Sequence, residues 1–274
     1  MMLRLFATMI IGLTLFGCGG SSALNDAPLV VSNAPNRPVN DPAPEVQPEG
    51  QPEPEPDPVA QKDADYIAFE GGLRAYPARK IVEMDAWLLG SQTRALEYLL
   101  VSPGGNTHES LFVAGADGLH LKRALEIIGA REAEEKRVGR GYVDKPLGDR
   151  IKLSVRFRHA KTGKQTTVPV EDWLWNVRIE GNPESAGFVF TGSFEQYRPE
   201  LNRSLFEADM KGNLIALWRD AACVLDNDRE DGYLPDIYSP YPDADGIPST
   251  LRGASPPVTL VFERWPAADP KEDD

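Results

Sequence analysis

The chain has 274 residues, of which 42 are acidic and 29 are basic, and its formal net charge is −13. Nucleic-acid binding depends on a basic face, so this composition predicts no nucleic-acid partner. The two cysteines of the chain, Cys18 and Cys223, are too few for a zinc ribbon, an iron–sulfur cluster or a thioredoxin-type pair. We therefore expect no resident cofactor, apart from the calcium ion considered below.

The first 17 residues have the organisation of an export signal. Arg4 is the one charged side chain, and the apolar run of residues 5–16 is shorter than the roughly 20 residues that span a bilayer core. The run ends in Leu15-Phe16-Gly17-Cys18, which resembles the lipobox of bacterial lipoproteins, with Phe16 as a departure from it. The resemblance implies cleavage after the signal peptide 1–17 and acylation of Cys18.

Acylated Cys18 would attach the protein to membrane lipid on the outer side of the cytoplasmic barrier. Gly19 and Gly20 follow it, where an Asp would indicate retention in the inner membrane, so the sequence favours the outer membrane. The alternative is a secreted protein in which Cys18 has no role. If Cys18 is acylated, Cys223 has no partner for an internal disulfide, and its apolar surroundings predict a buried free thiol.

Residues 18–62 are dense in proline and acidic residues, so we expect the lipidated cysteine to be followed by a disordered linker. Such a segment favours extended polyproline II structure, at about 3.1 Å per residue. It would act as a spacer, or alternatively as a proline-motif ligand for a partner domain. A globular domain is expected over 63–266, and 267–274 would form an acidic tail.

Several segments of the expected domain carry strand patterns. Residues 151–158 alternate apolar and polar side chains, residues 81–88 do so less regularly, and 96–101 is a nearly continuous apolar run. Further strands are expected at 188–191, 214–218 and 258–262. Lys211-Gly212-Asn213 predicts a turn that joins 206–209 and 214–218 as a hairpin.

Residues 117–129 have the pattern of a helix. Leu121, Ala124, Leu125 and Ile128 lie at helical spacing, Asp117 can cap the start, and Gly129 can end it. Residues 132–137 could extend this helix, and 170–175 could form a short helical turn. The whole predicts an α+β domain, with a mostly antiparallel β-sheet and one or two packed helices.

Several stretches resemble the YdjY-domain family of exported bacterial proteins. They include Gly105-Asn106-Thr107-His108-Glu109-Ser110-Leu111, the stretch Val189-Phe190-Thr191-Gly192-Ser193, and Gly212-Asn213-Leu214-Ile215. The resemblance runs from about Lys80 to Phe262. It supports the domain boundaries and implies no particular reaction, because we know of no activity for the family.

His108, Glu109 and Ser110 are the sharpest candidate site. Phe112 stands four positions after His108, so the two-histidine motif of zinc peptidases is missing. On a strand, His108 and Ser110 would share one face while Glu109 pointed away, so the three cannot form a catalytic triad alone. They could instead bind a ligand or metal, or satisfy backbone groups beside the glycine turn. Ser193 is a further candidate binding residue. It does not form a nucleophile elbow, because that motif has glycine two positions before and two positions after the serine, where this chain has Thr191 and Glu195.

An acidic stretch offers oxygen ligands for a cation. Its aspartates include Asp226, Asp228, Asp231, Asp243 and Asp245, which are weak candidates for a calcium site. The spacing does not match an EF-hand, and a solvated acidic loop is the simpler interpretation.

No complete catalytic constellation is visible in the sequence. We therefore expect a membrane-tethered domain that binds a small molecule or an envelope protein. The alternative is a hydrolase or metal-dependent enzyme that uses His108 with residues from elsewhere in the fold.

Overall fold

A computed structural model describes residues 65–89, 95–159, 162–240 and 257–265, all within one structural unit, Asp57–Asp274. The expected signal peptide, Cys18, the linker and the acidic tail lie outside the described residues. So do Asp243 and Asp245.

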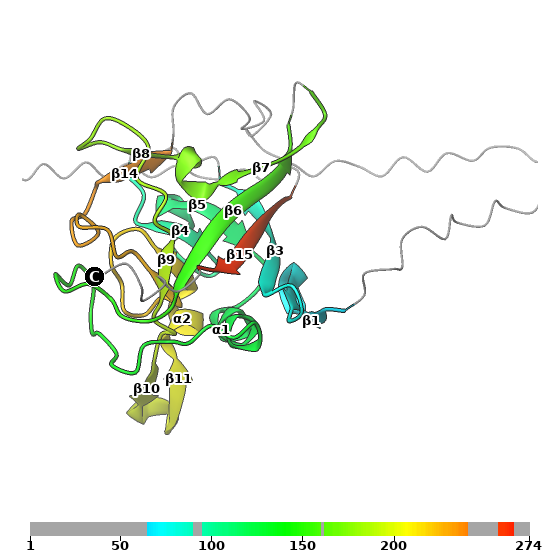
Figure 1. The fold of residues 1–274 in the computed structure, drawn as a ribbon. Helices are drawn as coiled ribbons and strands as arrows, with labels where there is room; N and C mark the ends of the chain where they lie inside the picture. The colour runs from blue at the N-terminus through cyan, green and yellow to red at the C-terminus, as the bar shows by residue number, and fades with distance from the viewer. Residues whose placement is uncertain (1–64, 90–94, 160–161, 241–256, 266–274) are drawn as a thin grey trace, which may run out of the picture. The chain divides into compact units, whose positions relative to one another are not determined.

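Eight strands of the described chain form a closed ring (Figure 1). Around the ring they are β3 (Ile81–Leu88), β15 (Val258–Arg264), β6 (Arg150–Arg158), β9 (Phe188–Phe190), β13 (Leu225–Asp226), β12 (Asn213–Ala216), β4 (Tyr98–Val101) and β5 (Ser110–Ala114). The ring closes because β5 pairs with β3. Most neighbours are antiparallel, but β12–β13 and β4–β5 are parallel, so the barrel is mixed.

Shorter strands extend this barrel at two places. β2 (Leu73–Tyr76) pairs with β3 and carries β1 (Ile67–Phe69) outside it, while β7 (Gln165–Pro169) pairs with β6. Two separate ribbons consist of β10 (Glu195–Arg198) with β11 (Arg203–Phe206), and of β8 (Leu174–Asn176) with β14 (Tyr238–Pro240). The β10–β11 ribbon projects from the end of the barrel where both α-helices lie (Figure 1).

The described residues hold two α-helices, α1 (Gly118–Ile127) and α2 (Glu207–Lys211). Four single 3-10 turns accompany them, namely η2 (Glu70–Gly72), η3 (Thr107–Glu109), η4 (Val170–Trp173) and η5 (Pro199–Leu201). Asp117 caps α1, since its Oδ1 accepts from the backbone N–H of His120 at 2.7 Å. Gly129 follows the helix with φ +87°, as the sequence predicted for its end. None of the described helices is both long and apolar enough to cross a bilayer.

The fold is mostly β rather than α+β, because the helices are short and the sheet closes on itself. The expected hairpin around Lys211-Gly212-Asn213 is wrong. Residues 207–211 form α2, and Gly212, at φ +66°, ends this helix in a left-handed conformation. Residues 132–137 form irregular chain and do not extend α1.

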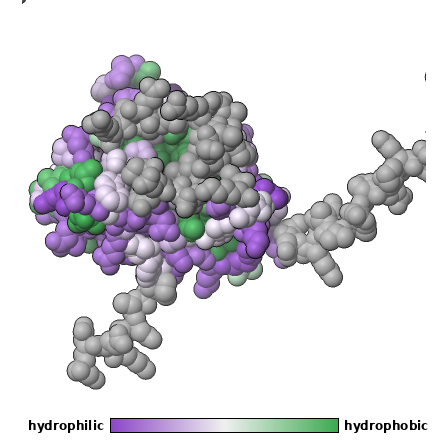
Figure 2. Space-filling view, turned by 90° about the horizontal axis from the view of Figure 1, so that it is seen from above, coloured by the Kyte–Doolittle hydropathy of each residue, from purple (hydrophilic) through white to green (hydrophobic). Residues whose placement is uncertain are grey.

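Apolar side chains from every strand of the ring fill the barrel. The alternation predicted along β6 is confirmed, because Ile151, Leu153 and Val155 are fully buried. Charged pairs form between strands of the sheet, including Arg74 of β2 with Asp85 of β3 at 2.7 Å and, across β15, Arg156 of β6 with Glu83 of β3 at 2.9 Å. Among the residues that are coloured in Figure 2, hydrophilic ones predominate.

Candidate functional site

A pocket of about 600 Å³ opens where the chain after β8 meets the chain after β13. This volume is within the range of roughly 300–1,000 Å³ that is usual for small-molecule sites. Its lining is unusually rich in charge. It includes Lys145, Arg150, Arg178, Glu184, Asp228, Arg229, Glu230 and Asp231.

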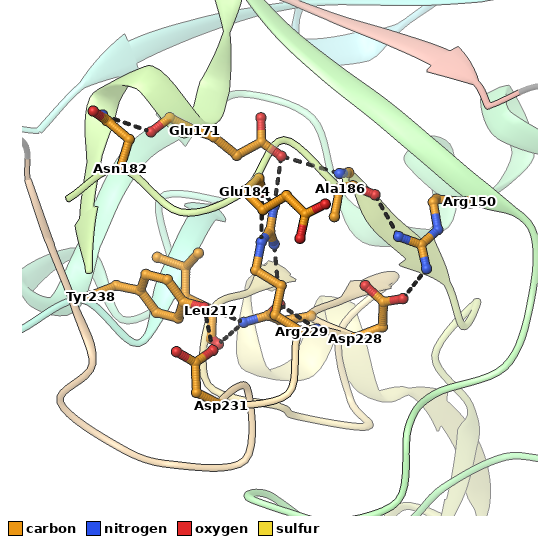
Figure 3. Close-up of polar contacts among 12 residues, drawn as sticks. Arg150, Glu171, Asn182, Glu184, Ala186, Leu217, Asp228, Arg229, Asp231 and Tyr238 are labelled. Carbon is orange, nitrogen blue, oxygen red and sulfur yellow. Dashed lines mark hydrogen bonds and ion pairs between the residues drawn. The ribbon is translucent and has the colours of Figure 1, made fainter. Parts of the chain in front are cut away.

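Arg150, the first residue of β6, holds one wall of the pocket. Its Nη1 donates to the carbonyl oxygen of Ala186 at 2.8 Å, and its Nη2 donates to Oδ2 of Asp228 (Figure 3). The other oxygen, Oδ1 of Asp228, is buried and accepts no hydrogen bond from any described residue. A buried acceptor without a partner costs roughly 1–3 kcal/mol, so this oxygen marks a place where a donor is needed.

Arg229 and Glu171 form a buried ion pair behind the pocket. Arg229 Nη2 lies 2.6 Å from Glu171 Oε1, and the two side chains are 8% and 3% exposed. Arg229 also donates to the carbonyl oxygen of Glu184 through Nε and Nη2, at 3.1 and 3.0 Å. Glu171 Oε1 accepts from the backbone N–H of Gly187 at 3.1 Å. The pair therefore fixes the loop that follows β8 against the chain that follows β13.

Asp231 lies on the other side of Arg229 from Asp228 (Figure 3). Its Oδ2 accepts from Asn176 Nδ2 at 2.7 Å, and its Oδ1 accepts from the hydroxyl of Tyr238 at 2.9 Å. Burial raises the pKa of Tyr238, so this hydroxyl remains a neutral donor. Among the described residues, Asp231 thus takes its hydrogen bonds from uncharged groups.

Arg219 connects two of the chain segments that line the pocket. It is 1% exposed, and its guanidinium donates to the carbonyl oxygens of Asn227 at 2.8 Å and Arg229 at 2.7 Å. It also donates to the carbonyl oxygens of residues 142–144. One buried cation therefore connects the segment that carries Lys145 to the segment that carries Asp228.

Two buried aspartates lie on the barrel side of this segment. Asp226 accepts from the hydroxyl of Tyr142, and Asp220 accepts from the hydroxyl of Tyr98 at 3.0 Å. Burial raises the pKa of Asp226 to about 7. Cys223 is fully buried, as predicted, and burial raises the pKa of its thiol. None of these groups lines the charged pocket.

The structure separates His108, Glu109 and Ser110 from the charged pocket. The first two belong to the 3-10 turn η3, where a strand was expected, and the side chain of His108 is 69% exposed. Its Nε2 lies 3.6 Å from Glu109 Oε1. Ser110 is buried, and its Oγ donates to the carbonyl oxygen of Asn106 at 2.6 Å. Ser110 thus satisfies a backbone group beside the glycine turn, which was one of the interpretations of this motif.

Ser193 is buried and has two backbone partners. Its Oγ donates to the carbonyl oxygen of Ala222 at 2.7 Å and accepts from the N–H of Ala208 at 3.2 Å. The hydroxyl of Thr191 donates to the carbonyl oxygen of Cys223 at 3.1 Å. The Thr-Gly-Ser stretch therefore joins the chain after β9 to residues 222–224. A second pocket, of about 360 Å³, is lined partly by Ser193, Lys122 and Lys136.

The candidate calcium ligands are distributed over different environments. Asp226 is bound to Tyr142 and backbone N–H groups, whereas Asp228 and Asp231 line the charged pocket. Within the described ranges, no group of three or more His, Cys, Asp or Glu side chains is placed to hold a metal ion. Asp243 and Asp245 lie outside those ranges.

Sequence reasoning missed Arg150, Glu171, Arg219 and Arg229. Their roles depend on partners that are distant in the chain. The one local signal is the charged pair Arg219-Asp220 within an otherwise apolar stretch, because charged residues in such a stretch must find buried partners.

The fold and the site together define a mixed β-barrel domain with a charged pocket supported by buried arginines. A model of the YdjY domain matches residues 77–231, which is more than half of the chain. The chain therefore belongs to the YdjY-domain family, and the matched segment contains all eight charged residues that line the pocket. No curated protein gives a significant match, and neither does any solved structure.

Proposed function

We propose that this protein is a membrane-tethered lipoprotein whose YdjY domain binds a small polar ligand outside the cytoplasm. The charged pocket carries the binding part of the proposal. Its walls are held by buried arginines, so the site is preorganised, and its rim leaves Arg178 and Glu184 exposed for contact. The tether rests on the Leu15–Cys18 motif and on the proline-rich spacer that follows it. The outer membrane is the proposed location.

The binding function is tested by thermal denaturation of the full chain against a panel of small polar metabolites. A true ligand should raise the melting temperature of the native protein. Glu184→Trp, which places an indole in the pocket, should abolish the increase. Ser185→Trp is the matched control on the neighbouring exposed position, outside the pocket lining, and should retain it. Equal responses of the two variants, or no stabilising compound, would contradict the proposal.

The tether is tested separately, by labelling growing bacteria with palmitate. The full chain should incorporate the label and fractionate with the outer membrane. Cys18→Ser should do neither, because the acyl chains that hold the protein are attached to this thiol. A Cys18→Ser chain that still carries the label would refute lipidation at this residue.

A further inference from the structure

We infer that Asn202 is a glycosylation site, at which a glycan is attached to the side-chain amide once the chain has been exported. The inference goes beyond ligand binding and rests on the export that the proposed function includes. It depends on the local sequence of the β10–β11 ribbon, on the exposure of the ribbon's tip and on the availability of the reacting groups.

The tip of the ribbon carries the acceptor pattern for N-glycosylation. This pattern is Asn, any residue except Pro, and then Ser or Thr, and Asn202-Arg203-Ser204 satisfies it. No other asparagine in the 274-residue sequence does so. Glu200 stands two positions before Asn202, where the oligosaccharyltransferases of many bacteria require an acidic residue. The stretch therefore matches the stricter, bacterial form of the pattern.

The structure presents this pattern on an exposed projection. The 3-10 turn η5 forms the tip, and the β10–β11 ribbon extends away from the barrel (Figure 1). Every residue from 199 to 204 is exposed. Asn202 has φ +49°, a left-handed conformation in which asparagine is enriched. An enzyme can therefore reach the tip after the domain has folded, without any movement of the barrel.

The reacting groups of the pattern are available. Oδ1 of Asn202 accepts from the hydroxyl of Tyr197 at 2.7 Å, which orients the amide. Within the described ranges, neither Nδ2 of Asn202 nor the hydroxyl of Ser204 is engaged in a hydrogen bond. Nδ2 can thus attack the anomeric carbon of a glycan that is carried on a lipid pyrophosphate. The new N–C bond replaces the bond from that carbon to a phosphate oxygen, the pyrophosphate leaves with the electron pair, and the amide nitrogen loses one proton.

A glycan at this tip would also cover a vulnerable part of the surface. The side chains of Tyr197 and Leu201 are 55% and 51% exposed. β10 and β11 pair only with each other among the described strands, so each leaves an edge to which another chain could add. A bulky, hydrophilic group on Asn202 would shield these side chains and hinder such pairing.

The test uses the full chain, purified from membranes of the bacterium that produces it, and mass spectrometry of the intact protein and of its peptides. We expect the mass of a glycan to be added to the peptide that contains Asn202. Asn202→Asp should lose this added mass completely. The variant keeps an acceptor for Tyr197 and a residue suited to the left-handed conformation, so it tests the amide nitrogen and not the fold.

Ser204 supplies a matched pair of variants at one exposed position. Ser204→Ala breaks the pattern and should abolish the added mass, whereas Ser204→Thr preserves the pattern and should retain it. Fractionation of the same cells reports export. An exported chain without a glycan on Asn202, or equal modification of the two Ser204 variants, would overturn the inference and leave export standing. A chain that remains in the cytoplasm would overturn both.

Discussion

Replacement of Arg219 tests the claim that one buried cation holds the pocket segments in place. In Arg219→Met, the carbonyl oxygen of Arg229 keeps a bond from Gly232 N–H at 2.9 Å, and water can reach the exposed Val143 and Asp144. Asn227 is fully buried, so water cannot replace the guanidinium at its carbonyl oxygen. One unpaired buried acceptor, together with the lost charge-assisted bonds, gives an expected loss of about 3 kcal/mol in the free energy of unfolding.

The assay is equilibrium urea unfolding of the full chain, followed by tryptophan fluorescence. The midpoint should fall while the slope stays constant, because the surface exposed on unfolding changes little. Arg123→Met, at an exposed position of α1, is the matched control and should lie within about 0.5 kcal/mol of the native protein. A loss below about 1 kcal/mol for Arg219→Met would show that the guanidinium does not hold these segments, and would refute the reasoning.

Substitutions at three positions probe buried groups of the domain. The pKa of Asp226 is raised from 3.8 to about 7, so the folded state retains a proton that the unfolded state has lost. As the pH rises between these values, the free energy of unfolding of the native protein should fall, relative to that of Asp226→Asn, by up to about 1.4 kcal/mol per pH unit. Urea titrations at several pH values measure this slope, and parallel curves for the two proteins would contradict it. Cys223→Ala should cost about 1 kcal/mol and Cys223→Asp several times more, because the latter buries an unpaired charge. The native thiol should react slowly with a thiol reagent, whereas rapid labelling or a disulfide-linked dimer would count against burial. Ser193→Ala should cost about 1–3 kcal/mol in the same unfolding assay, since it leaves the carbonyl of Ala222 and the N–H of Ala208 unpaired. A native-like midpoint would show that these bonds are replaced.

Local patterns were reliable where the deciding interactions are close in sequence. Asp117 caps α1 three residues away, Gly129 lies just beyond its end, and the alternation along β6 follows from the two faces of one strand. The 3-10 turn η4 falls where a short helical turn was predicted. In each case the residues that decide the conformation are within a few positions of one another.

The hairpin prediction failed because the glycine of Lys211-Gly212-Asn213 is compatible with two different structures. A glycine with positive φ serves a tight hairpin turn and the end of a helix equally well. Gly212 ends α2, and β12 then pairs with β4 and β13 rather than with the chain just before the turn. These partners come from other parts of the chain, so tertiary pairing outweighed the local pattern.

The acidic character of the chain, the positions of α1 and most strands, the burial of Cys223 and the family resemblance could all be predicted from composition and local pattern. The closure of the sheet into a barrel could not be predicted in this way, because closure depends on the pairing of β3 with β5. Only the tertiary structure decided the charged pocket, where Arg150 meets Asp228 and Glu171 meets Arg229 across 78 and 58 positions. A charged residue that becomes buried needs a partner, because an unpaired buried charge is costly. The sequence shows the charged residue, but only the fold determines which partner lies beside it.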